Sequence, residues 1–146
     1  MAGNRIAIIA SLILICAIAF LLYPFEQTIA PEWEVRVVDQ EGKPIAHIVK
    51  VTEFWEQYSL EENSHYDEKY TNAYGRVHFG RRTHQSSLGS RFIGCLGQYG
   101  RYGVHASCGP RSFLVAVAGG YEMDNYAGVR ALQTELQEST LVMKQR

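Results

Sequence analysis

The stretch IAIIASLILICAIAFLLY, residues 6–23, decides how the rest of the chain is arranged. It contains no charged residue, no Gly and no Pro. At the helical rise per residue it is about 27 Å long, close to the hydrocarbon thickness of a bilayer. The sequence therefore predicts one transmembrane helix over residues 6–23, followed by a chain that is too polar to enter lipid.

The charges beside this stretch predict its orientation. Arg5 and the terminal amine precede it, whereas Glu26, Glu32 and Glu34 follow it. Because positive flanks stay on the cytoplasmic side, we expect residues 1–5 in the cytoplasm and the rest outside it. The expected location is the plasma (inner) membrane, crossed once.

Two other interpretations of this stretch stay open. Ala17-Ile18-Ala19 has the small-x-small form of a signal-peptide cleavage site. Cys16 could carry a lipid, although the bulky Ile15 stands where a small residue is expected. Beyond the stretch, residues 24–31 contain two prolines and few apolar residues, so we expect a short tether.

The remaining residues, 32–146, have the composition of one strand-rich extracytoplasmic domain. The whole chain has 146 residues, 47% of them apolar, with 13 Gly and 9 Tyr, which favours strands and turns over a helical bundle. Its formal net charge of −1 gives no general attraction to nucleic acid, and no nucleic-acid partner is expected.

The domain opens with a strand-and-turn pattern. Since alternate residues of a strand share a face, Val49, Val51 and Glu53 are expected to point the same way. His47 and His78 are expected to be sheet residues as well. The pattern consists of VRVVD (35–39), the turn DQEGKP (39–44), IAHIVKVTEFW (45–55), which forms a hairpin with the first strand, and YTNAYGRVHF (70–79). Near the C-terminus, VRALQTELQE (129–138) fits a helix or a strand, and STLVMK (139–144) a closing strand.

Three pieces of the sequence together resemble the carboxypeptidase regulatory-like (prealbumin-like) β-sandwich family. They are strand–DQEGKP–strand, TNAYGRVHF (71–79) and SFLVAVAGGY (112–121). The resemblance implies a mainly β, Greek-key-like sandwich of about seven strands that packs on, anchors or presents something else. Two activities of related folds are not expected. LVMKQR lacks the Tyr-Arg-Gly-Ser tail of 5-hydroxyisourate hydrolases, and Arg36 stands in the strand where crosslinking pilin-type domains carry Lys.

Residues 80–110 interrupt the family pattern, which has a brief hairpin there. Ser86 or Ser87 could cap a helix in this insertion, and we expect a short helix across one mouth or face of the sandwich. Its apolar stripe would complete the core, which we favour, or line a ligand groove. The stripe recurs at helical spacing: Leu88, Phe92, Cys95, Leu96 and Tyr99.

Two cysteines of the insertion, Cys95 and Cys108, are expected to form a disulfide, because paired thiols outside the cytoplasm tend to oxidise. Free thiols, and a nucleophilic cysteine activated by a base such as His105, remain alternatives.

Basic residues dominate the stretch 69–121, which contains no Asp or Glu. Acids elsewhere on the surface could neutralise them, which we favour. Alternatively they form a patch for lipid headgroups or an acidic partner. The candidate basic patch is Arg81, Arg82, Arg91, Arg101 and Arg111.

The chain contains no HExxH, GxSxG or Walker motif. We therefore expect a non-enzymatic binding or scaffolding module of the cell envelope, without a cofactor. Its partners would be the bilayer, through residues 6–23, and an envelope protein. The alternative is an anchored hydrolase or metal-dependent enzyme that uses its His- and acid-rich loops. The candidate ligands are Glu61, Glu62, His65, Asp67, His84 and His105.

Overall fold

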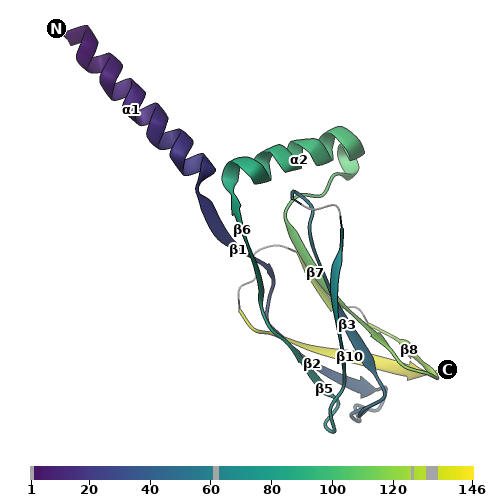
Figure 1. Cartoon of the computed structure of the whole chain (residues 1–146). Coiled ribbons are helices and arrows are strands. Elements are labelled where there is room, and N and C mark those ends of the chain that lie inside the picture. Colours follow the sequence, from purple (N-terminus) through teal and green to yellow (C-terminus); the bar gives the residue numbers. More distant parts are fainter. Residues whose placement is uncertain (1, 61–62, 126, 131–134) are drawn as a thin grey trace.

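The computed structural model describes residues 2–60, 63–125, 127–130 and 135–146. An apolar helix stands apart from a β-sandwich, and a second helix lies across the end of the sandwich that is nearest to the first (Figure 1). The elements are α1 (Ala2–Leu22), β1 (Pro24–Ala30), β2 (Trp33–Asp39), β3 (Lys50–Gln57), β4 (His65–Tyr70), β5 (Arg76–Phe79), β6 (Arg82–Ser87), α2 (Leu88–Tyr102), η1 (Gly103–His105), β7 (Pro110–Val117), β8 (Tyr121–Met123), β9 (Ala127–Arg130) and β10 (Gln137–Gln145).

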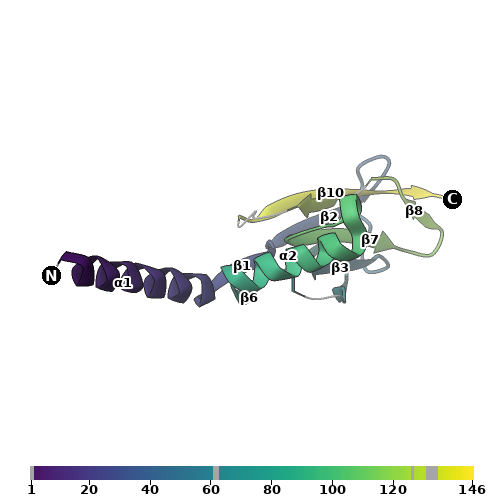
Figure 2. The same cartoon turned by 90° about the horizontal axis from the view of Figure 1, so that it is seen from above.

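Helix α1 has the length and apolar character predicted for a membrane span. Its segment Asn4–Leu22 has a mean hydropathy of 2.7, and none of that segment is buried against the rest of the protein. The helix projects away from the other elements in both views (Figures 1 and 2). By length and composition it can cross a bilayer.

The expected tether over residues 24–31 is wrong, because Pro24–Ala30 forms strand β1. This strand pairs antiparallel with β6, from Pro24 opposite Ser87 to Ala30 opposite Arg82. Pro24 takes the first position of the strand, where a missing N–H is tolerated. The apolar helix is therefore joined to the domain by a paired strand.

The sandwich consists of two four-stranded sheets, ordered β5-β2-β10-β8 and β4-β3-β7-β9. Strand β10 lies parallel to β2 and antiparallel to β8, and it contains the predicted closing strand. The predicted fold class, a mainly β sandwich with an inserted helix behind an apolar helix, is confirmed. Within the described residues the two sheets hold eight strands, against the seven or so expected.

The core lies between the two sheets. The alternation of buried and partly exposed residues is clearest in β7, where every second residue from Pro110 to Ala116 is buried. In β3, Val51 and Glu53 are both buried on the inner face, as the alternation predicts. The core residues are Trp33, Val35, Val37, Ile45, Val49, Val51, Val77, Phe79, Leu114, Ala116, Ala118, Leu141 and Met143.

The predicted hairpin of residues 35–55 is wrong, because β2 and β3 belong to different sheets. The chain between them crosses from one sheet to the other, held by the buried Ile45 and Val49. His47 lies in this crossing with a φ of 63°, and its N–H donates to the Thr71 carbonyl. It is therefore not a strand residue, whereas His78 lies in β5 as predicted.

The ambiguous segment 129–138 falls partly outside the described residues, at 131–134. Its first two residues belong to β9 and its last two to β10.

Candidate functional site

Two parts of the molecule carry unusual chemistry: the junction where α1, β1, β6 and α2 meet, and a row of charged residues on one open side of the sandwich. Arg91 is central to the junction. Its Nε donates to Ser86 Oγ at 2.7 Å, and its Nη2 donates to the carbonyls of Ser86 at 3.0 Å and Phe25 at 3.1 Å. One guanidinium thus ties the first turn of α2 to both β1 and β6.

Helix α2 begins at the predicted cap and lies against the end of α1. Ser87 Oγ accepts the N–H of Ser90 at 3.1 Å, which confirms the N-cap. A Cβ placed on Gly89 would be 3.3 Å from the carbonyl oxygen of Leu21, so the two helices meet at backbone distance. Phe25 packs edge-on against Tyr23, with ring centroids 5.0 Å apart. The end of the apolar helix and the start of α2 therefore form one structure.

The expectation that the stripe of α2 completes the core is wrong. No residue of α2 is buried, and Phe92 is 66% exposed. The side of α2 that meets the sandwich is made of small and polar residues instead. A Cβ on Gly94 would overlap the backbone carbonyl of Ser59, and Gly97 and Gln98 line a small pocket beside that contact. Apart from the half-buried Cys95, the apolar stripe therefore faces away from the sandwich.

The predicted disulfide between Cys95 and Cys108 is present, with the two Cα atoms 5.3 Å apart. It joins the middle of α2 to the segment just before β7. The alternatives of free thiols and a nucleophile at these positions are thereby wrong. His105 is exposed in η1, and Cys16 is a free cysteine on the exposed surface of α1.

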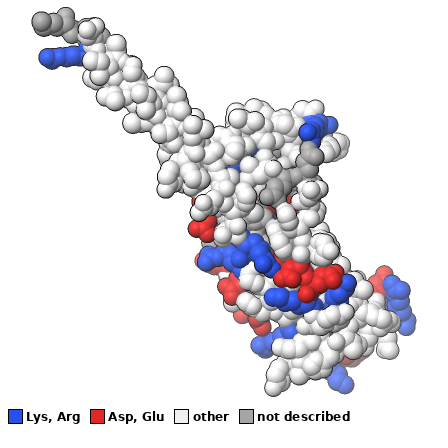
Figure 3. All heavy atoms as spheres, in the orientation of Figure 1, with Lys and Arg blue, Asp and Glu red and all other residues white. Residues whose placement is uncertain are grey.

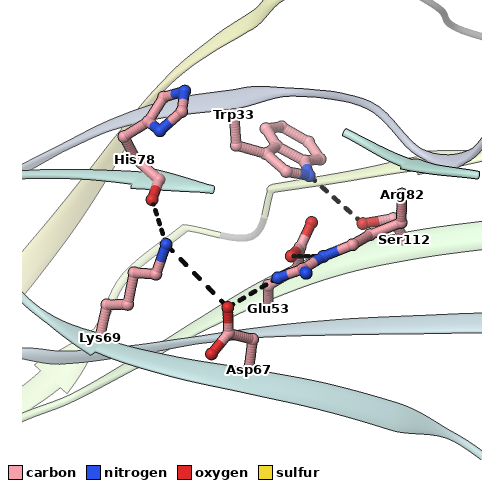
Figure 4. A network of polar contacts seen from close by, with 7 residues as sticks. All are labelled: Trp33, Glu53, Asp67, Lys69, His78, Arg82 and Ser112. Atoms are coloured by element: carbon pink, nitrogen blue, oxygen red, sulfur yellow. Dashed lines mark hydrogen bonds and ion pairs between the residues drawn. The ribbon is translucent and has the colours of Figure 1, made fainter. Parts of the chain in front are cut away.

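The charged row begins at Glu53, which points inward from β3 and is fully buried. Its cross-strand neighbour on β4 is Asp67, so the two carboxylates lie side by side. Arg82 reaches both from β6, with Nη2 2.6 Å from Asp67 Oδ2 and Nε 3.6 Å from Glu53 Oε2 (Figure 4). The guanidinium also lies over the ring of Trp55, 4.7 Å from its centroid.

Lys69 continues the row toward the other sheet. Its Nζ is 4.0 Å from Asp67 Oδ2 and donates to the His78 carbonyl at 2.8 Å (Figure 4). The imidazole of His78 in turn lies 2.8 Å from Glu32 Oε1. Because β4 and β5 are edge strands of different sheets, these contacts connect the two sheets across an open side of the sandwich.

The pKa of Glu53 is strongly perturbed. Burial raises its pKa to about 7, Arg82 opposes the rise, and the neighbouring Asp67 adds to it. Neither carboxylate oxygen of Glu53 accepts a hydrogen bond from the residues that the structure describes. The strand alternation placed Glu53 on the same face as Val49 and Val51, but nothing in the sequence marked it as part of a site, because its partner Arg82 comes from a distant strand.

The candidate metal ligands that the structure describes do not form one centre. His65 stacks on Trp55, with ring centroids 5.9 Å apart, and Asp67 is paired with Arg82. His65 and His84 line one pocket of about 340 Å³. Glu61 and Glu62 lie outside the described residues. Among the residues that are described, no three His, Cys, Asp or Glu side chains lie close enough to hold a metal ion.

The candidate basic patch is divided by the fold. Arg82 and Arg91 make the contacts given above, and Arg111 lies over the Phe113 ring, 5.2 Å from its centroid. Arg81 and Arg101 are exposed. Figure 3 shows charged side chains of both signs gathered over the sandwich, whereas the surface of α1 and α2 is almost free of them. A basic interaction surface stays a prediction.

The chain matches no model of a known protein family, and no curated protein sequence matches it either. The resemblance to carboxypeptidase regulatory-like domains therefore stays a prediction, and a function must be argued from the junction and the sandwich themselves.

Proposed function

We propose that this protein holds its β-sandwich at the outer face of the plasma (inner) membrane as a non-enzymatic binding or scaffolding module of the cell envelope. The span would be α1, with Arg5 kept on the cytoplasmic side. The Cys95–Cys108 disulfide supports an oxidising location for the sandwich.

One observation carries the proposal: helix α1 continues into the domain without a flexible linker. Only Tyr23 separates α1 from β1, and β1 pairs along its length with β6. Arg91 then fastens α2 to both strands. Because the connection is paired backbone, the sandwich keeps one orientation to the membrane, which is what a module that presents a binding surface requires.

The surface that we propose for the partner is the pocket that contains His65 and His84. It also holds Trp55, Gln57 and Arg81, so it combines flat rings with cationic and amide groups. Arginine and aromatic side chains are enriched among the residues that dominate protein–protein binding energy. The exposed Arg81 suits an acidic segment of an envelope protein.

Photo-crosslinking in intact cells tests this proposal. A photoreactive phenylalanine analogue would replace Thr83, an exposed residue of the same pocket, in the full chain, and the matched control would replace Lys144, which is exposed on β10. We expect one discrete adduct with an envelope protein from position 83 and none from position 144. Equal labelling at both positions would contradict the proposed surface. Saturable turnover of a small substrate by the purified chain, lost in His84→Ala, would favour the enzyme alternative instead.

A further inference from the structure

The outward side of α2 is an apolar surface that the described residues leave largely uncovered. It lies opposite Gly94, whose backbone touches the sandwich. A surface helix of a soluble domain normally turns its apolar stripe toward the core, which is the reverse of this arrangement. We call this apolar surface the outer face of α2. It consists of Leu88, Phe92, Ile93, Leu96 and Tyr99, whose side chains are 38%, 66%, 70%, 55% and 60% exposed.

The place of this face in the molecule indicates what covers it. Helix α2 starts beside the last turn of α1, where Gly89 meets the Leu21 carbonyl. It leaves that point at a steep angle to α1 instead of continuing it (Figure 1). Tyr23 and Phe25 surround the same point, and aromatic rings of this kind mark the level where lipid gives way to water. The outer face therefore begins at the depth where the span ends.

The polar groups of α2 agree with this position. The helix contains no acidic residue, and its two basic residues are Arg91, on the side of the sandwich, and Arg101, in the last turn. Tyr99 and Tyr102 are both more than half exposed, and amphipathic rings of this type are enriched at membrane interfaces. A row of apolar and aromatic residues without acids suits a surface of anionic headgroups.

We infer that α2 is an interfacial helix, whose outer face lies in the headgroup–acyl boundary of the leaflet in which α1 ends. Its apolar surface is continuous with the lipid-facing surface of α1 through the contact at Gly89, which favours lipid over a protein partner. The Cys95–Cys108 bond and the Gly94 contact hold the helix with this face outward. The inference requires that α1 spans the bilayer, but it requires neither the envelope partner nor the surface at Arg81.

Depth-dependent quenching tests the inference in the full chain. A Cys16→Ala background leaves no free cysteine among the residues that the structure describes, so that a single environment-sensitive fluorophore can be attached at Ile93→Cys. The matched control carries the same fluorophore at Tyr74→Cys, which is 75% exposed in the turn before β5. Both chains would be placed in nanodiscs of phosphatidylcholine and phosphatidylglycerol. The quencher is a lipid with a nitroxide high on its acyl chain, because interfacial helices sit about 5–10 Å deep.

We expect the fluorophore at position 93 to lose most of its emission to the nitroxide lipid and to resist aqueous iodide, and the one at position 74 to do the reverse. Adding Phe92→Ser and Leu96→Ser to the Ile93→Cys chain should return position 93 to the behaviour of position 74. Equal lipid quenching at both positions would overturn the inference. The inference would also be overturned if position 93 were protected from iodide only in discs that hold two chains, because a second copy of the chain would then cover the outer face of α2.

Discussion

Phe79 and Phe92 carry the same side chain in opposite surroundings. Phe79 lies in β5, fully buried between the sheets, whereas Phe92 lies on α2 and is 66% exposed. The core of the sandwich is apolar, and charges of both signs lie on the face of it that Figure 3 shows, whereas α1 and the outer face of α2 expose their large apolar side chains. This difference is what our proposals require, in which water surrounds the sandwich and lipid surrounds the two helices.

Truncation of the two phenylalanines tests this contrast most strongly. Phe79→Ala should lower the free energy of unfolding of the sandwich by about 3–5 kcal/mol, because it leaves a cavity in a packed core. Phe92→Ala should change it by less than about 0.5 kcal/mol, since the ring contacts no core. Denaturant unfolding of the full chain in detergent micelles, followed by fluorescence of the buried Trp33, measures both. A similar loss for Phe92→Ala would show that its ring packs on the domain.

Loss of the disulfide should cause the next largest decrease in the free energy of unfolding. The double variant Cys95→Ser with Cys108→Ser opens a link between residues 13 apart. Closing such a loop removes about 3 kcal/mol of unfolded-state entropy, so a comparable destabilisation is expected. Because the bond lies at α2 and not between the sheets, hydrogen exchange should quicken in α2 more than in β3 or β7. Uniform loss of protection over all three elements would mean that the two regions unfold together.

Glu53 gives the sandwich a stability that depends on pH. Its folded pKa of about 7 is above the ordinary 4.5, so the folded state binds the proton more tightly than the unfolded chain does. Its ionisation therefore destabilises the fold as the pH rises from about 4.5 to 7, by up to about 3 kcal/mol once both states are ionised.

Glu53→Gln should thus stabilise the chain at pH 8 and have little effect near pH 4, apart from the weaker contact that Gln makes with Arg82. Unfolding curves over this range check the prediction, and Glu122→Gln, at an exposed acid of β8, is the control. An unchanged pH profile in Glu53→Gln would show that Arg82 keeps the acid ionised throughout.

Local patterns predicted the elements that depend on few residues. The apolar run, the Ser87 cap and the cysteine pair each predict their structure from neighbours in sequence. The strand β1 was missed because it is stable only through its pairing with β6, more than fifty residues away. The hairpin of residues 35–55 failed for a similar reason, since β10 from the far end of the chain takes the place beside β2.

The direction of the α2 stripe was also beyond local patterns. A helical spacing of apolar residues shows that one side is apolar, but it does not show whether core or lipid covers that side. The deciding residue is Gly94, and a glycine within a helix looks in sequence only like a weakness. The charged row was hidden in the same way, because Glu53 and Arg82 come from strands of different sheets.

The contact at Gly94 sets which side of α2 faces the sandwich, so it offers the finest test. Gly94→Val forces a side chain into the Ser59 carbonyl, and we expect a loss of about 1–3 kcal/mol as the helix moves off the loop. Gly97→Ala is the matched control, because a Cβ there meets nothing within 4 Å. Alanine is the better helix former by up to about 1 kcal/mol, so this change should be neutral or slightly stabilising.

If both variants keep the Cys95–Cys108 bond, any difference between them belongs to the packing of α2 and not to the fold of the sandwich. The fluorophore at position 93 then reports the consequence. In Gly94→Val it should become less uniformly quenched by the nitroxide lipid, because a helix that is released from Ser59 no longer has one fixed rotation. An unchanged depth in this variant would mean that lipid alone orients α2, and that the glycine contact follows from that orientation instead of setting it.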